Sequence, residues 1–220
     1  MIKLSDFSAV IFDMDGLVLD TETTYFVAWQ RAAEAMGYAL SEPFCLSLSG
    51  LHYKDVELKL MAWCGADFNL QTFNHLSGIF WRDYVNAHGI NTQHGFTELL
   101  EYIVQQRMPY CLATNSRAIN ANECLELAGL KDVFSIIITR DDVQHGKPAP
   151  DIFLKAAGLL QVPISQCLVL EDSHAGILAA TRAGAFSVFV PSIEPVDQLA
   201  AELCDVMMID LAHTLMSFKS

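Results

Sequence analysis

The 220-residue chain lacks several features that would assign it to common functional classes. Its six cysteines are scattered and form no CxxC pair, which disfavours a structural zinc site. No apolar run approaches the roughly 20 residues that a transmembrane helix needs. The N-terminus has no basic region followed by a long apolar stretch and a cleavage site. We therefore expect a cytoplasmic protein with no membrane partner.

Basic residues are also scarce. The chain holds 13 Lys and Arg against 26 Asp and Glu, a formal net charge of −13, and no run of basic residues appears. Because nucleic-acid phosphates require clustered Lys and Arg, we expect no nucleic-acid partner. An anionic substrate would need a bound cation and local hydrogen-bond donors to offset the overall charge. The 52% hydrophobic content predicts an ordered globular protein.

Short apolar runs recur along the chain and predict buried strands. They are continuous and not alternating, which is typical of strands covered on both faces. Helical periodicity fills the segments between them. This alternation predicts an α/β fold with a Rossmann-like parallel sheet and helices on both sides. The predicted strands are residues 8–12, 109–114, 133–139, 166–170, 185–190 and 205–209, and the predicted helices are residues 96–106, 117–127, 150–160 and 173–183.

Residues 20–91 break this alternation, because they show helical periodicity without a comparable apolar strand. Crossovers between strands are usually short, so we interpret the segment as a helical-bundle cap inserted after the first strand. The alternative is a thick helical layer of a single domain. We expect a core domain of residues 1–19 and 92–220 and a cap domain of residues 20–91, with predicted cap helices at residues 25–36, 53–64 and 70–86.

Polar residues follow four of the predicted strands. In an open parallel sheet the carboxyl ends of the strands share one edge, where ligands bind. Two residues apart on an extended chain, Asp13 and Asp15 project to the same side, and their repulsion needs a metal or a proton to offset it. Oxygen ligands favour Mg²⁺ over zinc. The remaining residues at this edge are Thr114, Asn115 and Ser116 after the second strand, Lys147 after the third, and Glu171, Asp172 and Ser173 after the fourth.

These residue types suit phosphoryl transfer. One carboxylate can attack phosphorus and form an aspartyl-phosphate, while another donates a proton to the leaving oxygen and later activates water. Asp13 and Asp15 can divide these tasks. Thr114 and Asn115 can donate hydrogen bonds to phosphoryl oxygens, and Lys147 with Mg²⁺ would let a phosphate dianion approach. We therefore predict a small-molecule phosphate ester as the substrate.

The segments VIFDMDGLVLDTE, LATNS, GKPAPDIF and LVLEDSHAGILAATRAG occur in this order. Together they resemble the haloacid dehalogenase superfamily, in its subgroup with a helical cap, and the resemblance spans essentially the whole chain. It implies Asp13 as the nucleophile and Asp15 as the general acid and base. It further implies Mg²⁺ held by Asp13, by the backbone carbonyl of Asp15 and by Asp172, phosphoryl contacts from Thr114 and Lys147, and a metal-bound water held by Glu171.

Within the superfamily the resemblance favours a sugar-phosphate phosphatase, such as one acting on 2-deoxyglucose 6-phosphate. A phosphoglycolate-type phosphatase is a second possibility, which the EDS segment fits less well. Dehalogenases of the superfamily lack an acid at the position of Asp15. β-Phosphoglucomutase is also similar, but its cap carries a His and an Arg where this sequence has Tyr25 and Tyr53. A mutase is therefore the alternative. The candidate substrate contacts from the cap are Tyr25, His52, Tyr53 and Lys54.

Two further alternatives come from other functional classes. A signalling receiver also gathers Asp, Thr and Lys around Mg²⁺, but it needs no helical insertion of this size. An inactive relative kept as a binding protein would have lost Asp13, Asp15, Lys147 or Asp172, and all four are present. We expect an active enzyme, and a capped protein of this size is expected to be a monomer.

Overall fold

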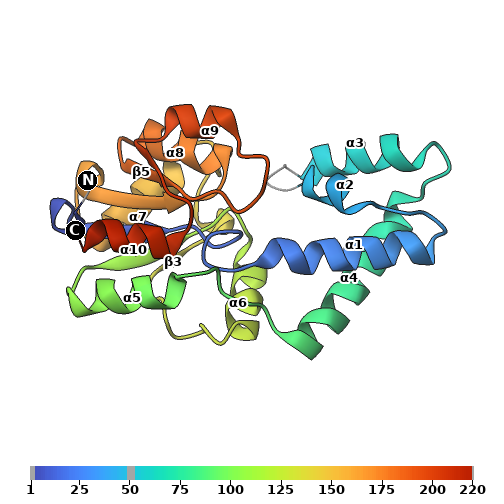
Figure 1. Cartoon of the computed structure of the whole chain (residues 1–220), viewed down its shortest axis with the longest axis horizontal. Helices are drawn as coiled ribbons and strands as arrows, with labels where there is room; N and C mark the ends of the chain where they lie inside the picture. Colours follow the sequence, from blue (N-terminus) through green and yellow to red (C-terminus); the bar gives the residue numbers. More distant parts are fainter. Residues whose placement is uncertain (1–2, 49–52, 220) are drawn as a thin grey trace. The chain divides into compact units, whose positions relative to one another are not determined.

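The computed structural model describes residues 3–48 and 53–219. The chain divides into two units, which are described separately. Met1–Asp20 and Asn91–Ser220 form the core unit, and Thr21–Ile90 forms the cap unit (Figure 1). That the core and the cap each fold as a domain of their own stays a prediction.

Within the described residues, the core unit is built on a six-stranded sheet. The strand order is β3-β2-β1-β4-β5-β6, and every neighbouring pair is parallel. The predicted α/β fold with a Rossmann-like sheet is confirmed, and its first strand lies at the centre. The strands are β1 (Ala9–Phe12), β2 (Tyr110–Ala113), β3 (Ile137–Ile138), β4 (Cys167–Glu171), β5 (Phe186–Phe189) and β6 (Val206–Met207).

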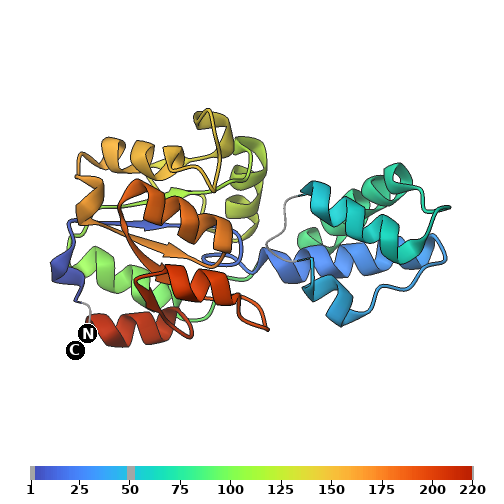
Figure 2. The same ribbon diagram turned by 90° about the horizontal axis from the view of Figure 1, so that it is seen from above.

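Alternate residues of each strand point to opposite faces of the sheet, and helices cover both faces. On one face, Ala9 and Ile11 belong to a buried cluster with residues of α7 and α8. On the other, the ring of Phe12 packs edge-on against Phe96 of α5, and α10 lies beside α5 (Figures 1 and 2). The core helices are α5 (Phe96–Gln105), α6 (Ala118–Leu127), α7 (Asp151–Leu160), α8 (His174–Ala183), α9 (Gln198–Leu203) and α10 (Leu211–Phe218), with 3₁₀ turns η1 (Leu4–Asp6), η2 (Arg140–Asp142) and η3 (Ile164–Gln166).

The two outer strands, β3 and β6, are shorter than predicted. Residues 133–136 precede β3 without pairing as a strand. Phe134 is buried, and its ring packs against those of Phe12 and Tyr110. The hydroxyl of Tyr110 donates a hydrogen bond to the backbone carbonyl of Val133 at 3.0 Å. The apolar run before β3 therefore reflects a buried aromatic ring, and short edge strands also expose fewer unpaired backbone groups.

The cap unit is a helical bundle in which α1 packs along α4. Its buried cluster includes Ala32, Leu60 and Phe73, one from each of the three long helices. The short helix α2 was not predicted, and it begins after Ser41, whose hydroxyl accepts the backbone N–H of Phe44 at 3.3 Å. The cap helices are α1 (Thr21–Ala35), α2 (Glu42–Leu46), α3 (Tyr53–Cys64) and α4 (Leu70–His88).

All six cysteines are free thiols. Cys111 and Cys167 lie in the cluster beneath α7 and α8, and burial raises the pKa of Cys167 to about 11 and that of Cys124 to about 12. These thiols behave as small apolar side chains. Across residues 3–48 and 53–219, we find no helix with the length and apolar character required to traverse a bilayer.

Candidate active site

The loop after β1 carries two aspartates at the carboxyl edge of the sheet. The backbone N–H of Asp13 still donates to the carbonyl of Leu170 at 3.0 Å, so this residue stays anchored to β4. Gly16 then turns the chain with φ +82°, and its N–H donates to the carbonyl of Leu19 at 2.8 Å. A central buried strand and a tight turn therefore fix the backbone on both sides of Asp15.

Lys147 places its ammonium group between two buried carboxylates. Nζ donates to Asp13, to Oε1 of Glu171 at 2.6 Å and to the carbonyl of Ala113 at 2.8 Å. The side chain of Lys147 is 3% exposed. Burial opposes its charge, but Asp13 and Glu171 outweigh this effect and raise the pKa of Lys147 above its ordinary value. The site therefore contains a fixed cation.

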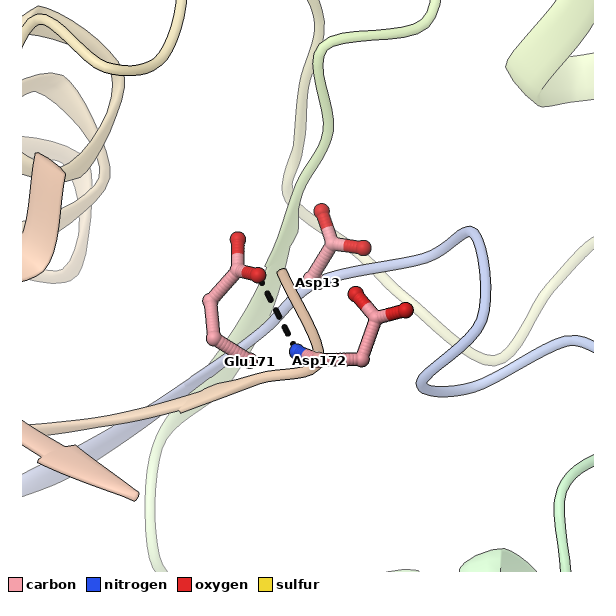
Figure 3. Close-up of side chains that lie close together, drawn as sticks. All are labelled: Asp13, Glu171 and Asp172. Carbon is pink, nitrogen blue, oxygen red and sulfur yellow. Dashed lines mark hydrogen bonds between the residues drawn. The ribbon is translucent and has the colours of Figure 1, made fainter. Parts of the chain in front are cut away.

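Three carboxylates from two neighbouring strands come together at the same edge (Figure 3). Asp13 follows β1, Glu171 ends β4, Asp172 follows it, and one oxygen of each lies within 4.8 Å of the others. Oε2 of Glu171 accepts the backbone N–H groups of Asp172 and Ser173, both at 3.1 Å, and the Ser173 hydroxyl at 3.0 Å. Glu171 is thus held rigidly between these donors and Lys147. We call Asp13, Glu171 and Asp172 the acidic cluster.

The acidic cluster fits a hard divalent cation. If all three carboxylates are ionised, they carry three negative charges against the one positive charge of Lys147, a net charge of −2. Burial raises the pKa of Asp13 well above its ordinary value, against the lowering effect of Lys147, and the charges of Glu171 and Asp15 raise it further. A divalent cation bound by oxygen ligands would offset this repulsion. A metal contact through the backbone carbonyl of Asp15 stays a prediction.

The side chain of Asp15 lies among different partners. Oδ2 of Asp15 accepts the Ser116 hydroxyl at 2.7 Å and the Thr114 hydroxyl at 3.3 Å. The backbone N–H of Ser116 donates to Oγ1 of Thr114 at 2.9 Å. Asp13 thus faces an ammonium group and Asp15 faces hydroxyls, although the two residues share one loop. Different surroundings of this kind give two carboxyl groups separate acid–base tasks.

Asn115 holds the backbone of Lys147. Its Nδ2 donates to the carbonyl of Lys147 at 3.0 Å, and the N–H of Lys147 donates to its Oδ1 at 2.8 Å. The side-chain amide therefore positions the residue that supplies the cation. A contact between Asn115 and phosphoryl oxygens stays a prediction.

Two glycines leave room for the carboxylates. A Cβ added at Gly16 would overlap with Oδ2 of Asp172, which also accepts the Ser192 hydroxyl at 2.8 Å. A Cβ added at Gly176 would overlap with the carboxylate of Glu171. Sequence reasoning missed Gly16, Gly176 and Ser192. Gly16 lies in the segment VIFDMDGLVLDTE, three residues after Asp13, and Gly176 lies in LVLEDSHAGILAATRAG, four residues after Asp172. Ser192 lies outside the segments that carry the resemblance.

The comparisons with known proteins agree with this geometry. The sequence profile of haloacid dehalogenase-like hydrolases matches residues 10–190. The chain belongs to this family. The phosphorylated carbohydrates phosphatase of Thermotoga maritima is 32% identical over 179 residues, which cover 80% of this chain and 81% of the relative. The β-phosphoglucomutase of Bacillus subtilis is 31% identical over 217 residues, covering 94% and 93%.

Solved structures of the haloacid dehalogenase-like family share the fold. A crystal structure from Thermotoga maritima, provisionally assigned as a β-phosphoglucomutase, matches with a TM-score of 0.82 and 28% identity, covering 96% of this chain and 98% of that one. With phosphatases among its relatives, this family member is a phosphoric monoester hydrolase. The alternative of a signalling receiver is therefore wrong.

Replacing Gly16 by alanine is expected to destabilise this hydrolase and to weaken the binding of any divalent cation that the acidic cluster holds. A side chain at φ +82° costs about 1–2 kcal/mol, and the new methyl group would also displace Asp172. Gly184→Ala is the matched control, because Gly184 has φ +80° and, among the described residues, a Cβ there meets nothing within 4 Å. Urea unfolding and calorimetric Mg²⁺ titration compare the two variants. Equal losses in both would contradict the contact with Asp172.

The four cap residues predicted to contact substrate lie in different surroundings. The ring of Tyr25 stacks on Trp29 with centroids 6.1 Å apart and on Trp81 with centroids 5.9 Å apart, so Tyr25 belongs to an aromatic stack. Lys54 lies in α3. His52 and the side chain of Tyr53 lie outside the described residues. Substrate contacts from all four residues stay predictions.

Proposed function

We propose that this chain hydrolyses a small sugar phosphate in a Mg²⁺-dependent reaction that passes through an aspartyl-phosphate on Asp13. The different surroundings of Asp13 and Asp15 carry this proposal. Asp13 is 6% exposed and lies against Lys147 within the acidic cluster, as a nucleophile near a bound cation would. Asp15 is held by hydroxyls on the neighbouring strand end, as a proton donor would be.

In the first half-reaction, a carboxylate oxygen of Asp13 forms a bond to phosphorus while the bond between phosphorus and the ester oxygen breaks. The protonated carboxyl group of Asp15 donates its proton to that oxygen, and the sugar leaves as an alcohol. Lys147 offsets the negative charge of Asp13 as the phosphoryl group approaches. A Mg²⁺ ion bound by Asp13 and Asp172 would supply further charge neutralisation at the phosphoryl oxygens.

In the second half-reaction, Asp15 acts as a base. Its carboxylate takes a proton from a water molecule whose oxygen bonds to the phosphorus of the aspartyl-phosphate. The bond between phosphorus and the Asp13 oxygen breaks, and inorganic phosphate leaves. Both carboxyl groups return to their starting protonation states, so one residue serves as acid and then as base.

The second candidate function is a β-phosphoglucomutase-like phosphotransfer, which the Bacillus subtilis relative favours. A mutase would return the phosphoryl group from Asp13 to another sugar hydroxyl and not to water. At the position where the resemblance to the mutase would place a histidine that contacts the second phosphate, this chain has Tyr25, whose ring stacks on Trp29 and on Trp81. This difference favours hydrolysis.

Phosphate release from a panel of sugar phosphates, phosphoglycolate and nucleoside monophosphates tests the proposal. We expect Mg²⁺-dependent release from one or two sugar phosphates and background release in EDTA. We also expect Mg²⁺ to raise the melting temperature of the wild type, because a ligand of the folded state stabilises it, and to leave that of Asp172→Asn unchanged. Phosphate release that survives EDTA would contradict the role of the metal. Isomerisation of a sugar phosphate after addition of a sugar bisphosphate would instead establish the mutase.

The proposal includes a cytoplasmic monomer without a nucleic-acid partner. Six free thiols and a formal net charge of −13 support the location and the lack of that partner. Size-exclusion chromatography with light scattering checks the monomeric state, which a mass of twice 24.4 kDa would contradict.

A further inference from the structure

We propose that Ser116 is a positioning residue for Asp15, fixing which carboxyl oxygen of Asp15 exchanges protons with the substrate. Because Asp15 is taken as the proton donor, this role of Ser116 rests on the proposed function. Ser116 follows β2 by three residues, and its side chain reaches across to the loop after β1. The sequence places Ser116 at the site edge without indicating a chemical task for it.

Ser116 supports Asp15 in two ways. Its hydroxyl donates directly to Oδ2 of Asp15 at 2.7 Å, a distance typical of a good O–H···O hydrogen bond. Its backbone N–H donates to Oγ1 of Thr114 at 2.9 Å, which orients the Thr114 hydroxyl so that its proton points to the same oxygen. The Thr114 contact with Asp15 is longer, at 3.3 Å. Ser116 is therefore the main support of this carboxyl group.

The backbone around Ser116 is fixed to β3 and to the segment that follows it. The N–H of Thr114 donates to the carbonyl of Ile138 at 2.9 Å, and the N–H of Arg140 donates to the carbonyl of Ser116 at 3.0 Å. Parallel pairing of β1 with β2 brings the two strand ends side by side. Ser116 thus acts from a rigid base, and its hydroxyl can hold Asp15 in one orientation.

Both hydroxyls approach Oδ2, so Oδ1 of Asp15 takes no part in this network. Fixing one carboxyl oxygen sets the direction of the other, and proton transfer requires that oxygen to lie within hydrogen-bonding distance of the reacting group. Without Ser116, the carboxyl group can rotate. Loss of Ser116 therefore affects proton transfer and leaves substrate binding in place.

Ser116→Ala tests this role with two substrates that differ in the leaving group. A sugar alkoxide needs a proton to leave, whereas p-nitrophenolate leaves without one. For the best sugar phosphate we expect kcat to fall about 10–100-fold, with KM nearly unchanged, because a misoriented acid loses only part of the roughly 10²–10⁴-fold that general acid–base catalysis contributes. In a single turnover of p-nitrophenyl phosphate, the rate of nitrophenolate release by Ser116→Ala is expected to equal that of the wild type. Ser116→Thr keeps the hydroxyl and is expected to restore kcat, and Ser135→Ala, at an exposed serine of the same unit, serves as the control.

Three kinetic outcomes would overturn the role of Ser116. Equal losses with both substrates indicate a general structural effect, a raised KM with unchanged kcat indicates direct substrate contact, and unchanged kinetics indicate no role. Inactivity of the wild type toward the whole panel would defeat the proposed function separately. Crystal structures of wild type and Ser116→Ala then decide, because displacement of the Asp15 carboxyl group in the variant supports its positioning by Ser116 and an unmoved Asp15 contradicts it.

Discussion

Asp13→Asn is expected to lower kcat by at least about 10⁴-fold while the protein still folds, because the nucleophile and a proposed metal ligand are lost together. Asparagine has nearly the same shape, and Lys147 keeps Glu171 as a counterion. Burial raises the pKa of Asp13, so the ionised carboxylate destabilises the folded state at neutral pH. Its removal partly offsets the weakened contact with Lys147, so we expect the free energy of unfolding without metal to fall by less than the about 3–5 kcal/mol that losing one partner of a buried ion pair typically costs.

Steady-state kinetics and urea unfolding on the same preparation check this prediction. Wild type is expected to form a phosphoenzyme that hydroxylamine cleaves, as an acyl phosphate is, and Asp13→Asn is expected to form none. Asp132→Asn is the matched control, since Asp132 is exposed on the surface of the core unit and its replacement should leave kcat unchanged. Substantial turnover by Asp13→Asn would refute the aspartyl-phosphate mechanism.

The core fold could be predicted because continuous apolar runs report strands buried on both faces. The run ending at Phe12 corresponds to β1, and polar residues directly after it lie at the binding edge. The run at residues 133–139 was misleading, because periodicity records burial without distinguishing a paired strand from one buried ring. Phe134 is buried by aromatic neighbours from β1 and β2, which no local pattern could show.

The candidate site could be predicted as a set of residues but not as a set of contacts. Strand ends indicated that Asp13, Lys147 and Glu171 would share one edge, and the structure brings these side chains together. The support of Asp15 by Ser116 joins positions 101 residues apart in the chain. Such pairs depend on strand order and register, which composition and periodicity leave open. The space that Gly16 leaves for Asp172 depends on them too.

Lys147→Met is expected to remove turnover and also to destabilise the fold. Methionine fills a similar volume without a charge, so it would leave the carboxylates of Asp13 and Glu171 without their ammonium group. Glu171 is fully buried, and removing one partner of a buried ion pair typically costs about 3–5 kcal/mol. Lys155→Met is the matched control. The side chain of Lys155 is 39% exposed, and its Nζ lies 3.4 Å from Oδ1 of Asp142 and donates to the carbonyl of Asp142 at 2.7 Å. An exposed ion pair of this kind contributes at most about 1 kcal/mol.

The double variant Lys147→Met with Glu171→Gln separates the two effects of Lys147. If the instability comes from uncompensated charge in the acidic cluster, removing the charge of Glu171 restores part of the free energy of unfolding, measured by urea denaturation in EDTA. Turnover should stay absent, because no ammonium group faces Asp13 and the incoming phosphoryl group. A double variant no more stable than Lys147→Met would mean that the lysine contributes by packing. Recovery of stability without turnover would show that the same ammonium group holds the acidic cluster together and prepares Asp13 to receive a phosphoryl group.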